Sequence, residues 1–331
     1  MNDIYDYICV MIDVFEQYLK SVDAKESTRV TYGKALDCFS RWVEERGTSV
    51  SELRREDLLE YKSFLTESNK SALTINLYLS TLRGFFKWAD GESICPNIAV
   101  GVGSLRTNKN TFRRMHLENE QGAQLLTDAY LPKRVCGVNA GVTQKLNSNE
   151  QLIALRDFAM LNLMLRTGLR TIEVSRADIK DITRKKGRRI LKVWGKGHSE
   201  KDDFVVLTDE AYLPIKEYLA ERKDAKPEDP LFCGAGFGHS GNRMSTRTIQ
   251  DICKKHLRAI GLDGHEYSAH SLRHTTGTQL LLNGGNMFDV QNVLRHASPA
   301  TSQIYVNTIM EDKRLDDASE ELLDTAFKNN Q

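Results

Sequence analysis

The sequence predicts a mainly helical protein of the α+β class, built from two helical domains with one small β-hairpin or sheet. Three observations support this prediction. Apolar residues recur at helical spacing over most of the 331-residue chain. Residues 93–116 interrupt that spacing and separate two apolar-patterned parts. One pair of short β-like runs lies at 189–207. The length suffices for two domains with cores of their own.

Residues 1–92 are predicted to form four short helices that pack as a bundle. An amphipathic run covers residues 4–20. Ser27, Ser51 and Ser71 each precede a further apolar stripe, and serine is a favoured N-cap residue. We therefore expect the second, third and fourth helices to begin at these serines.

Two of these helices carry polar faces opposite their apolar stripes. Such faces can enter a major groove and hydrogen-bond to bases and phosphates. The candidate DNA-binding residues are Thr31, Lys34, Asn76, Ser80, Arg83 and Lys87. An ordinary solvated helix face would have the same composition, so both interpretations stay open for each residue.

Residues 93–116 are predicted to be an interdomain linker. Glycine and proline break the helical period there, and basic side chains replace apolar ones. Arg113 and Arg114 are the candidate DNA contacts in this stretch. A basic linker suits two lobes that close around a duplex, although linkers are also polar because they are exposed.

Residues 117–331 form the second predicted domain. It begins with a helix at 118–129, followed by an irregular stretch at 131–148 to which we assign no role. Residues 149–165 are so apolar that they predict a core helix. Gly168 ends that helix, and another short one follows.

An arginine and an acid follow this helix break. Arg170 lies just after Gly168, and Glu173, three residues on, is placed to orient it. Downstream, the runs 189–194 and 203–207 predict a β-hairpin, with Lys196 between two glycines in its loop. Helices are expected at about 209–223 and 245–260.

Titratable side chains gather near the C-terminus on what we expect to be two or three short helices. They are His270, Arg273, His274, His296 and Tyr305. Each histidine could be a core or capping residue, and Tyr305 an ordinary buried aromatic. The spacing nevertheless favours a functional site, provided that upstream residues supply partners.

Taken in order, these motifs resemble the tyrosine recombinase family, the phage-type integrases and Xer-like enzymes. The motifs are Thr167-Gly168-Leu169-Arg170-x-x-Glu173, Gly195-Lys196-Gly197, His270-x-Leu272-Arg273-His274, Leu294-x-His296-x-Ser298 and Ile304-Tyr305. Each motif alone occurs often by chance, but their joint occurrence in this order is specific to the family. The resemblance implies that 1–92 is a core-binding domain and 117–331 a catalytic domain.

The resemblance implies site-specific recombination of double-stranded DNA through a 3′-phosphotyrosyl intermediate and a Holliday junction. Tyr305 would be the nucleophile. Arg170 and Arg273 suit the non-bridging phosphate oxygens, because a guanidinium stays charged and donates in a planar fork. Lys196 would protonate the leaving oxygen, with Lys201 as the fallback candidate.

The two remaining roles fall to histidines. His270 would take the tyrosine proton, and His296 would donate to the phosphate. Glu173 and His274 would orient these catalytic groups without contacting the phosphate. The mechanism requires neither a metal nor another cofactor. It would serve integration, excision or resolution of mobile DNA.

Three rival interpretations use the same residues. His270 and His274, at i and i+4, could be zinc ligands, but Ser271 stands where a zinc protease motif has glutamate. A non-catalytic DNA-binding regulator would not need the complete set of catalytic residue types. A type IB topoisomerase-like strand transferase would use the same set.

The sequence departs from the family pattern in places. Arg295 stands where the family often has glycine, and Ala269 where it often has proline. The stretch 131–148 is also longer than expected. Neither Arg295 nor Ala269 replaces a reacting group.

Composition limits the cellular setting. No stretch approaches the roughly 20 apolar residues of a membrane span, and the acidic N-terminus is unlike a signal peptide. The six cysteines form no C-x-x-C pair, so neither disulfides nor a zinc ribbon are expected. We expect a cytoplasmic protein that associates with the nucleoid when bound to DNA.

Charge is unevenly distributed although the net charge is only +1. Residues 309–331 carry seven acids and three bases, so the remaining 308 residues sum to +5. Basic clumps lie at 113–114, 184–189 and 254–258, and each is compatible with phosphate contacts or with a solvated face.

The C-terminal segment predicts an assembly. Residues of about 309–327 form an amphipathic pattern. The resemblance implies that this tail helix docks onto the neighbouring protomer of a homotetramer on DNA. Packing on its own protomer is the alternative. Accessory proteins are compatible with the resemblance.

Overall fold

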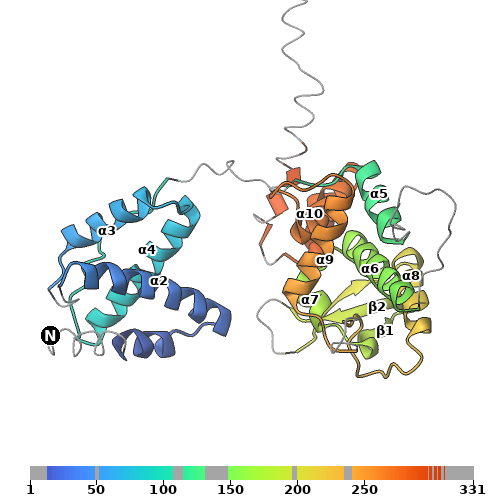
Figure 1. Ribbon diagram of the computed structural model, residues 1–331, viewed down its shortest axis with the longest axis horizontal. Helices are drawn as coiled ribbons and strands as arrows, with labels where there is room; N and C mark the ends of the chain where they lie inside the picture. The colour runs from blue at the N-terminus through green and yellow to red at the C-terminus, as the bar shows by residue number, and fades with distance from the viewer. Residues whose placement is uncertain are drawn as a thin grey trace, which may run out of the picture. The chain divides into compact units, whose positions relative to one another are not determined.

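The computed structural model describes residues 13–48, 52–106, 115–130, 148–195, 200–234 and 241–296, with 298–299, 302–303, 305–306 and 309. The chain divides into two compact units, Met1–Thr111 and Phe112–Gln331. Figure 1 shows that helices dominate both and that strands occur in the second unit. The predicted fold class is therefore confirmed. None of the described helices is long and apolar enough to cross a membrane.

The first unit is a helical bundle. Residues 13–21 are helical, and α2 (Glu26–Glu45), α3 (Arg55–Glu67) and α4 (Ala72–Gly91) follow. Their inner faces are unusually aromatic. Phe39, for example, contacts the rings of Trp42, Tyr61 and Phe86 with centroids 4.9–6.1 Å apart. Aromatic pairs at such distances add to the free energy gained by burial.

The predicted helix starts were partly wrong. Ser71 caps α4 as expected, and its Oγ accepts a hydrogen bond from the backbone N–H of Thr74. By contrast, α2 begins at Glu26 after an N-cap at Lys25, so Ser27 lies inside the helix. Helix α3 is capped by the Asp57 carboxylate, which accepts from the Arg54 N–H at 2.7 Å. Ser51 lies outside the described residues.

The segment after α4 packs back onto the first unit. Cys95, Ala99 and Val102 are buried in its core. This segment is the first part of the predicted linker 93–116. The described chain stops at residue 106 and resumes at 115. The domain limits 1–92 and 117–331 therefore stay a prediction.

The second unit is organised around one central helix. Helix α6 (Ser148–Thr167) packs against α5 (Asn119–Tyr130), α8 (Asp209–Glu221) and α10 (Ala269–Leu282). It is buried along most of its length, which confirms the predicted core helix. The short helix α7 (Thr171–Arg176), with α9 (Thr246–Ala259) and α11 (Met287–Leu294), completes the helical part.

The β element has one strand more than predicted. Strands β1 (Ile182–Lys185), β2 (Arg188–Val193) and β3 (Asp203–Val206) form an antiparallel sheet in the order β1-β2-β3. Lys186 and Gly187 connect β1 to β2, and both have positive φ. Two such residues make the turn that best matches hairpin twist. The sequence pattern of residues 184–189 indicated a cluster of basic side chains and did not predict this turn.

Candidate active site

Arg170 is placed by the break between α6 and α7. Gly168 has φ +61°, and an added Cβ there would lie 2.3 Å from Leu294 Cδ2, so the break requires glycine. Glu173 then accepts from the Arg170 backbone N–H at 2.7 Å and from its Nη1 at 2.8 Å. The Glu173 side chain is only 4% exposed. A buried carboxylate therefore holds both the backbone and the guanidinium of Arg170.

Arg273 lies buried on α10, held by backbone carbonyls at the C-terminal ends of α6 and α11. Its Nη1 donates to the Gly168 carbonyl and its Nη2 to the Leu294 carbonyl. Burial, together with the charge of Arg170, lowers the pKa of Arg273 to about 10. The side chain therefore keeps its charge at neutral pH, where it can attract a phosphate.

His296 is neutral at pH 7 in this environment. Burial and the charges of Arg273 and Arg170 lower its pKa to about 4. Its Nδ1 lies 2.8 Å from the hydroxyl of buried Ser302. When Ser302 donates this bond, Nε2 carries the ring proton and can donate to an oxyanion.

Tyr305 is buried, with 4% of its surface exposed. Its ring lies parallel to that of His296, with centroids 6.1 Å apart, and 4.7 Å from His274. An added Cβ on Gly277 would lie 2.7 Å from the ring, so this helix position accommodates the tyrosine because it is glycine. Burial raises the pKa of Tyr305, while Arg273 and Arg170 act against that rise.

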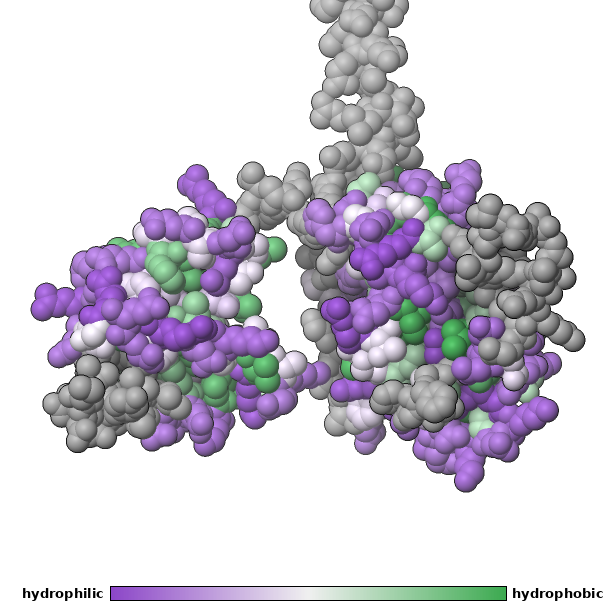
Figure 2. All heavy atoms as spheres, viewed as in Figure 1, coloured by the Kyte–Doolittle hydropathy of each residue, from purple (hydrophilic) through white to green (hydrophobic). Residues whose placement is uncertain are grey.

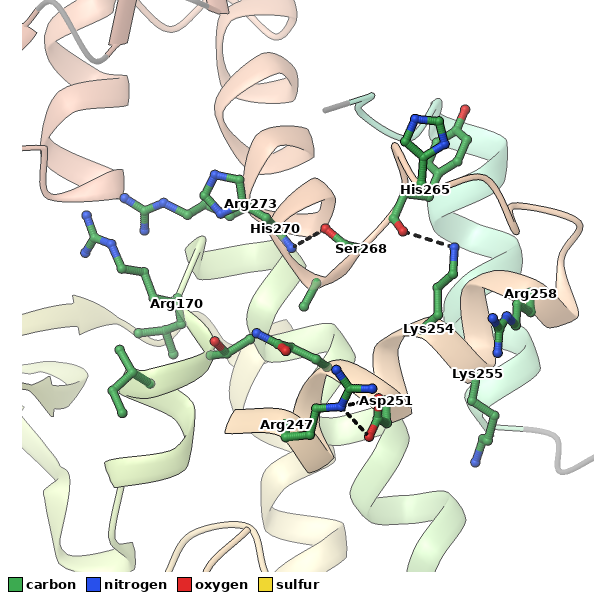
Figure 3. Close-up of a pocket in the computed structure, with 16 residues that line it drawn as sticks. Arg170, Arg247, Asp251, Lys254, Lys255, Arg258, His265, Ser268, His270 and Arg273 are labelled. Carbon is green, nitrogen blue, oxygen red and sulfur yellow. Dashed lines mark hydrogen bonds and ion pairs between the residues drawn. The ribbon is translucent and has the colours of Figure 1, made fainter. Parts of the chain in front are cut away.

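Arg170 and Arg273 line a basic groove. It has a volume of about 880 Å³ and is lined by α7, α9, α10 and the segment before α10. In Figure 3, Arg170, Arg273 and His270 lie on one side, and Lys254, Lys255 and Arg258 come from α9. His270 is exposed at the start of α10, where its backbone N–H donates to Ser268 Oγ. The groove therefore suits an anionic ligand.

Sequence reasoning found part of this lining. The basic residues at 254–258 were predicted as candidate phosphate contacts, whereas Arg247 was not. Arg247, Lys254 and Arg258 recur at intervals of seven and four along α9. That helical spacing was the available signal. Sequence reasoning also missed that Arg295 pairs with Glu173, at 2.7 Å.

The two candidate lysines differ in what can be said of them. Lys196 lies outside the described residues. Lys201 donates to Asp178 at 2.8 Å and also to Asp181, and its side chain is 16% exposed. Two carboxylates thus hold the ammonium of the fallback candidate. Releasing it to protonate a leaving group would first require breaking both ion pairs.

The candidate DNA-binding residues fall into three groups. Lys34, Ser80 and Lys87 are exposed, whereas Thr31 Oγ1 donates to the Ser27 carbonyl at 2.8 Å. Arg113 and Arg114 lie outside the described residues. All of these contacts with DNA stay predictions.

Asn76 and Arg83 have partners within the first unit. Asn76 exchanges two hydrogen bonds with the backbone of Leu105, at 2.7 and 3.0 Å. Arg83 donates to the Val102 carbonyl at 3.0 Å and to Ser104 Oγ at 3.1 Å. Both side chains therefore fasten the segment after α4 to the bundle.

The zinc interpretation finds no support in the geometry. His270 is exposed, whereas His274 is buried against Tyr305. Within the described ranges, no group of three or more histidine, cysteine, aspartate or glutamate side chains could hold a metal ion.

Known proteins share both the sequence and the fold. Residues 12–92 match the phage integrase N-terminal SAM-like domain. Tyrosine recombinase XerD of Pseudomonas putida is 27% identical over 289 residues, covering 85% of this chain and 87% of that protein. Tyrosine recombinase XerC of Corynebacterium glutamicum is 28% identical over 313 residues, covering 92% and 89%.

Two solved structures extend the likeness of fold. One is XerH recombinase bound to palindromic difH in a post-cleavage complex, with TM-score 0.68, 23% identity, and 88% and 78% of the two chains covered. The other is a lambda integrase dimer bound to a COC′ core site, with TM-score 0.61, 16% identity, and 89% and 94% covered. Residues 140–311 match the phage integrase family itself, and this chain belongs to that family.

Proposed function

We propose that this protein is a site-specific DNA recombinase that cuts and rejoins DNA strands through Tyr305. One observation carries the proposal. Arg170, Arg273 and His296 come from three different segments: the two arginines line a basic groove and act electrostatically on the buried Tyr305, and the ring of His296 lies parallel to that of Tyr305. This set supplies a nucleophile, together with cations and a hydrogen-bond donor for the phosphate in the transition state.

The first chemical step is a transesterification. The Tyr305 oxygen attacks the scissile phosphorus, and the bond from phosphorus to the 5′-oxygen breaks. His270, exposed at the groove, receives the phenolic proton. Lys196 supplies a proton to the departing oxygen. The resulting 3′-phosphotyrosyl bond conserves the ester, so a second 5′-hydroxyl can reverse the step and join a new strand.

Preorganised charge lowers the barrier of this step. Arg170 and Arg273 meet the non-bridging oxygens, and neutral His296 donates through Nε2. Their positions are set by Glu173, by the Gly168 and Leu294 carbonyls, and by Ser302. Removing one preorganised donor of this kind typically costs about 10²–10³ in rate.

The partner is double-stranded DNA, contacted by both units. A lambda integrase tetramer bound to a Holliday junction has the same fold, with TM-score 0.61 and 17% identity. We propose that four protomers of this chain likewise assemble on two DNA sites. Exchange of the tail at 309–327 between protomers is part of the proposal, and that segment lies outside the described residues.

A covalent adduct is the decisive test. Wild-type protein is incubated with nicked duplexes drawn from a randomised library of sites, and adducts that survive denaturation are recovered and sequenced. We expect an adduct from the wild type and none from Tyr305→Phe. Tyr212→Phe, a matched change on α8, should form the adduct normally.

Three outcomes would contradict the proposal. DNA binding without any adduct would indicate a regulator. Relaxation of supercoiled DNA regardless of sequence would indicate a topoisomerase-like enzyme. An adduct that persists in Tyr305→Phe would show that another residue is the nucleophile.

A further inference from the structure

Arg295 has an unusual backbone for an arginine. It forms the C-cap of α11, directly before His296, with φ +54° and ψ +52°. This left-handed conformation favours glycine and is uncommon for a branched or long side chain. The Arg295 side chain is nevertheless only 7% exposed. The fold therefore buries a guanidinium at a position where glycine would be less strained.

The buried guanidinium shares a carboxylate with Arg170. Arg295 Nη2 donates to Glu173 Oε2 at 2.7 Å, and its Nη1 donates to the Val293 carbonyl at 2.9 Å. The same carboxylate accepts the Arg170 backbone N–H and its Nη1. Glu173 thus holds Arg170 from one side while Arg295 holds Glu173 from the other.

Arg295 also approaches the base of the hairpin loop. Its Nε lies 3.6 Å from Asp203 Oδ2, which is an ion-pair distance and too long for a hydrogen bond. Among the described residues, this buried Nε has no hydrogen-bond partner. Asp203 begins β3 and pairs with Val193 at the end of β2. Those two strands carry the loop that contains Lys196.

Among the described residues, positive charges outnumber negative ones near Arg295. The buried carboxylate of Glu173 pairs with Arg170 and Arg295 and also acts electrostatically on Arg273, whereas the carboxylate of Asp203 is 35% exposed. Arg295 is among the charges that lower the pKa values of Arg273 and His296. This surplus of positive charge suits an anionic ligand.

We propose that Arg295 is a positioning residue for strand cleavage. It immobilises Glu173, and through it Arg170. By its pairing with Asp203 it also sets the base of the Lys196 loop relative to the two phosphate-binding arginines. The inference rests on the proposed function, because it concerns how the same site is aligned. Arg295 itself need not touch the phosphate.

The test separates alignment from binding and from folding. Arg295→Gly removes the side chain and relieves the positive φ, so the backbone should tolerate it. We expect single-turnover formation of the Tyr305 adduct at saturating DNA to slow by about 10- to 100-fold, the usual cost of small misplacements. The Kd for DNA should change by less than about threefold. Ser93→Gly, another positive-φ position but exposed and in the first unit, should cleave normally.

One further variant, Arg295→Lys, distinguishes positioning from charge alone. Arg295→Lys keeps the charge but not the planar fork that reaches both Glu173 and Asp203. It should restore less than about a third of the lost rate. The pKa of His296, followed by NMR, should rise in Arg295→Gly and return towards the wild-type value in Arg295→Lys.

A double-variant cycle tests the connection to the loop. Asp203→Asn should slow cleavage severalfold in the wild type and have little further effect in Arg295→Gly. Additive effects would disprove the connection. Wild-type cleavage by Arg295→Gly would overturn the inference while leaving the recombinase proposal intact. Failure of the wild type to form any adduct would overturn the proposed function instead.

Discussion

The two units keep their cores together by different means. The described core of the first unit is apolar and aromatic, and it includes Phe39, Tyr61, Phe85 and Phe86. Among the described residues, the buried charged side chains lie in the second unit and include Arg156, Asp157, Glu173, Asp181, His256, Arg273, His274 and Arg295. Both exteriors are largely hydrophilic in the view of Figure 2, so this difference is internal.

The difference reflects what each unit must do. Packing aromatic rings needs only shape and burial, and it leaves the surface available for DNA. Buried charges are costly unless they are paired, and a phosphate site requires them to stay unbalanced until substrate arrives. The second unit therefore combines a network of paired charges with a surplus of positive charge, which we propose receives the phosphate.

Asp157 is the centre of the paired network. It is 1% exposed and accepts from Arg156, Lys255 and His256 at distances of 2.6–3.0 Å. His256 also contacts Asp128 at 2.8 Å through its other ring nitrogen. Burial alone would raise the pKa of Asp157, but His256, Arg156 and Lys255 together hold it well below its usual range.

The largest predicted effect would test this contrast directly. Asp157→Asn should lower the free energy of unfolding of the second unit by about 3–5 kcal/mol at pH 7, since it leaves the buried guanidinium of Arg156 without its carboxylate partner. Phe39→Ala should cost the first unit about as much, 3–5 kcal/mol, through a cavity. Urea unfolding followed by circular dichroism measures both.

The two changes should differ in their response to acid. A carboxyl whose pKa is depressed in the folded state stabilises above its unfolded pKa of about 4, and loses that contribution as pH falls. The gap between wild type and Asp157→Asn should therefore shrink from pH 7 to pH 3, while the Phe39→Ala gap stays constant. If the difference in free energy of unfolding from the wild type changed equally with pH for both variants, the proposed contrast between the two cores would be wrong.

The next prediction concerns the surplus of positive charge around Glu173 and uses the titration of His296. Histidine titration can be followed only in the second unit. All eight histidines lie at or after residue 116. The folded-state pKa of His296, about 4, lies below the ordinary value of about 6.5. Folding thus favours neutral His296, so its contribution to stability is complete above about pH 6.5 and is lost as pH falls towards 4.

Binding of DNA should reverse part of this shift. A phosphate between Arg170 and Arg273 offsets their charges, and so should raise the pKa of His296. NMR titration with and without a duplex that carries the site measures the change, and His296→Gln identifies the resonance. An unchanged pKa in the complex would mean that no phosphate lies beside His296.

The smallest effect uses a matched pair of glycines in helices of the second unit. Gly122 on α5 has no atom near an added Cβ, so Gly122→Ala should stabilise by about 0.5–1 kcal/mol through helix propensity. Gly277→Ala should instead destabilise by about 1 kcal/mol, because the new methyl displaces the ring of Tyr305. Thermal unfolding compares them, and stabilisation by both would show that Tyr305 does not lie against α10.

Local signals were enough to predict many elements. The period of apolar residues identified α4, α5, α6 and α9 with small errors at their ends. The helix break at Gly168 located α7. Two of the predicted helix starts are wrong, because serine is not the only residue that begins a helix: α2 follows Lys25, and α3 is capped by Asp57 from within the helix. Strand β1 was missed because its exposed half is basic and has no apolar alternation.

By itself, the sequence determined the fold class, most of the helices and the order of Arg170, Arg273, His296 and Tyr305, because periodicity and motif spacing are local properties. Tertiary structure decided which groups these residues meet. Glu173 and Arg295 are 122 residues apart, and Arg273 lies 105 residues from the Gly168 carbonyl. Such pairings depend on how α6, α7, α10 and α11 pack, and no local pattern records that packing.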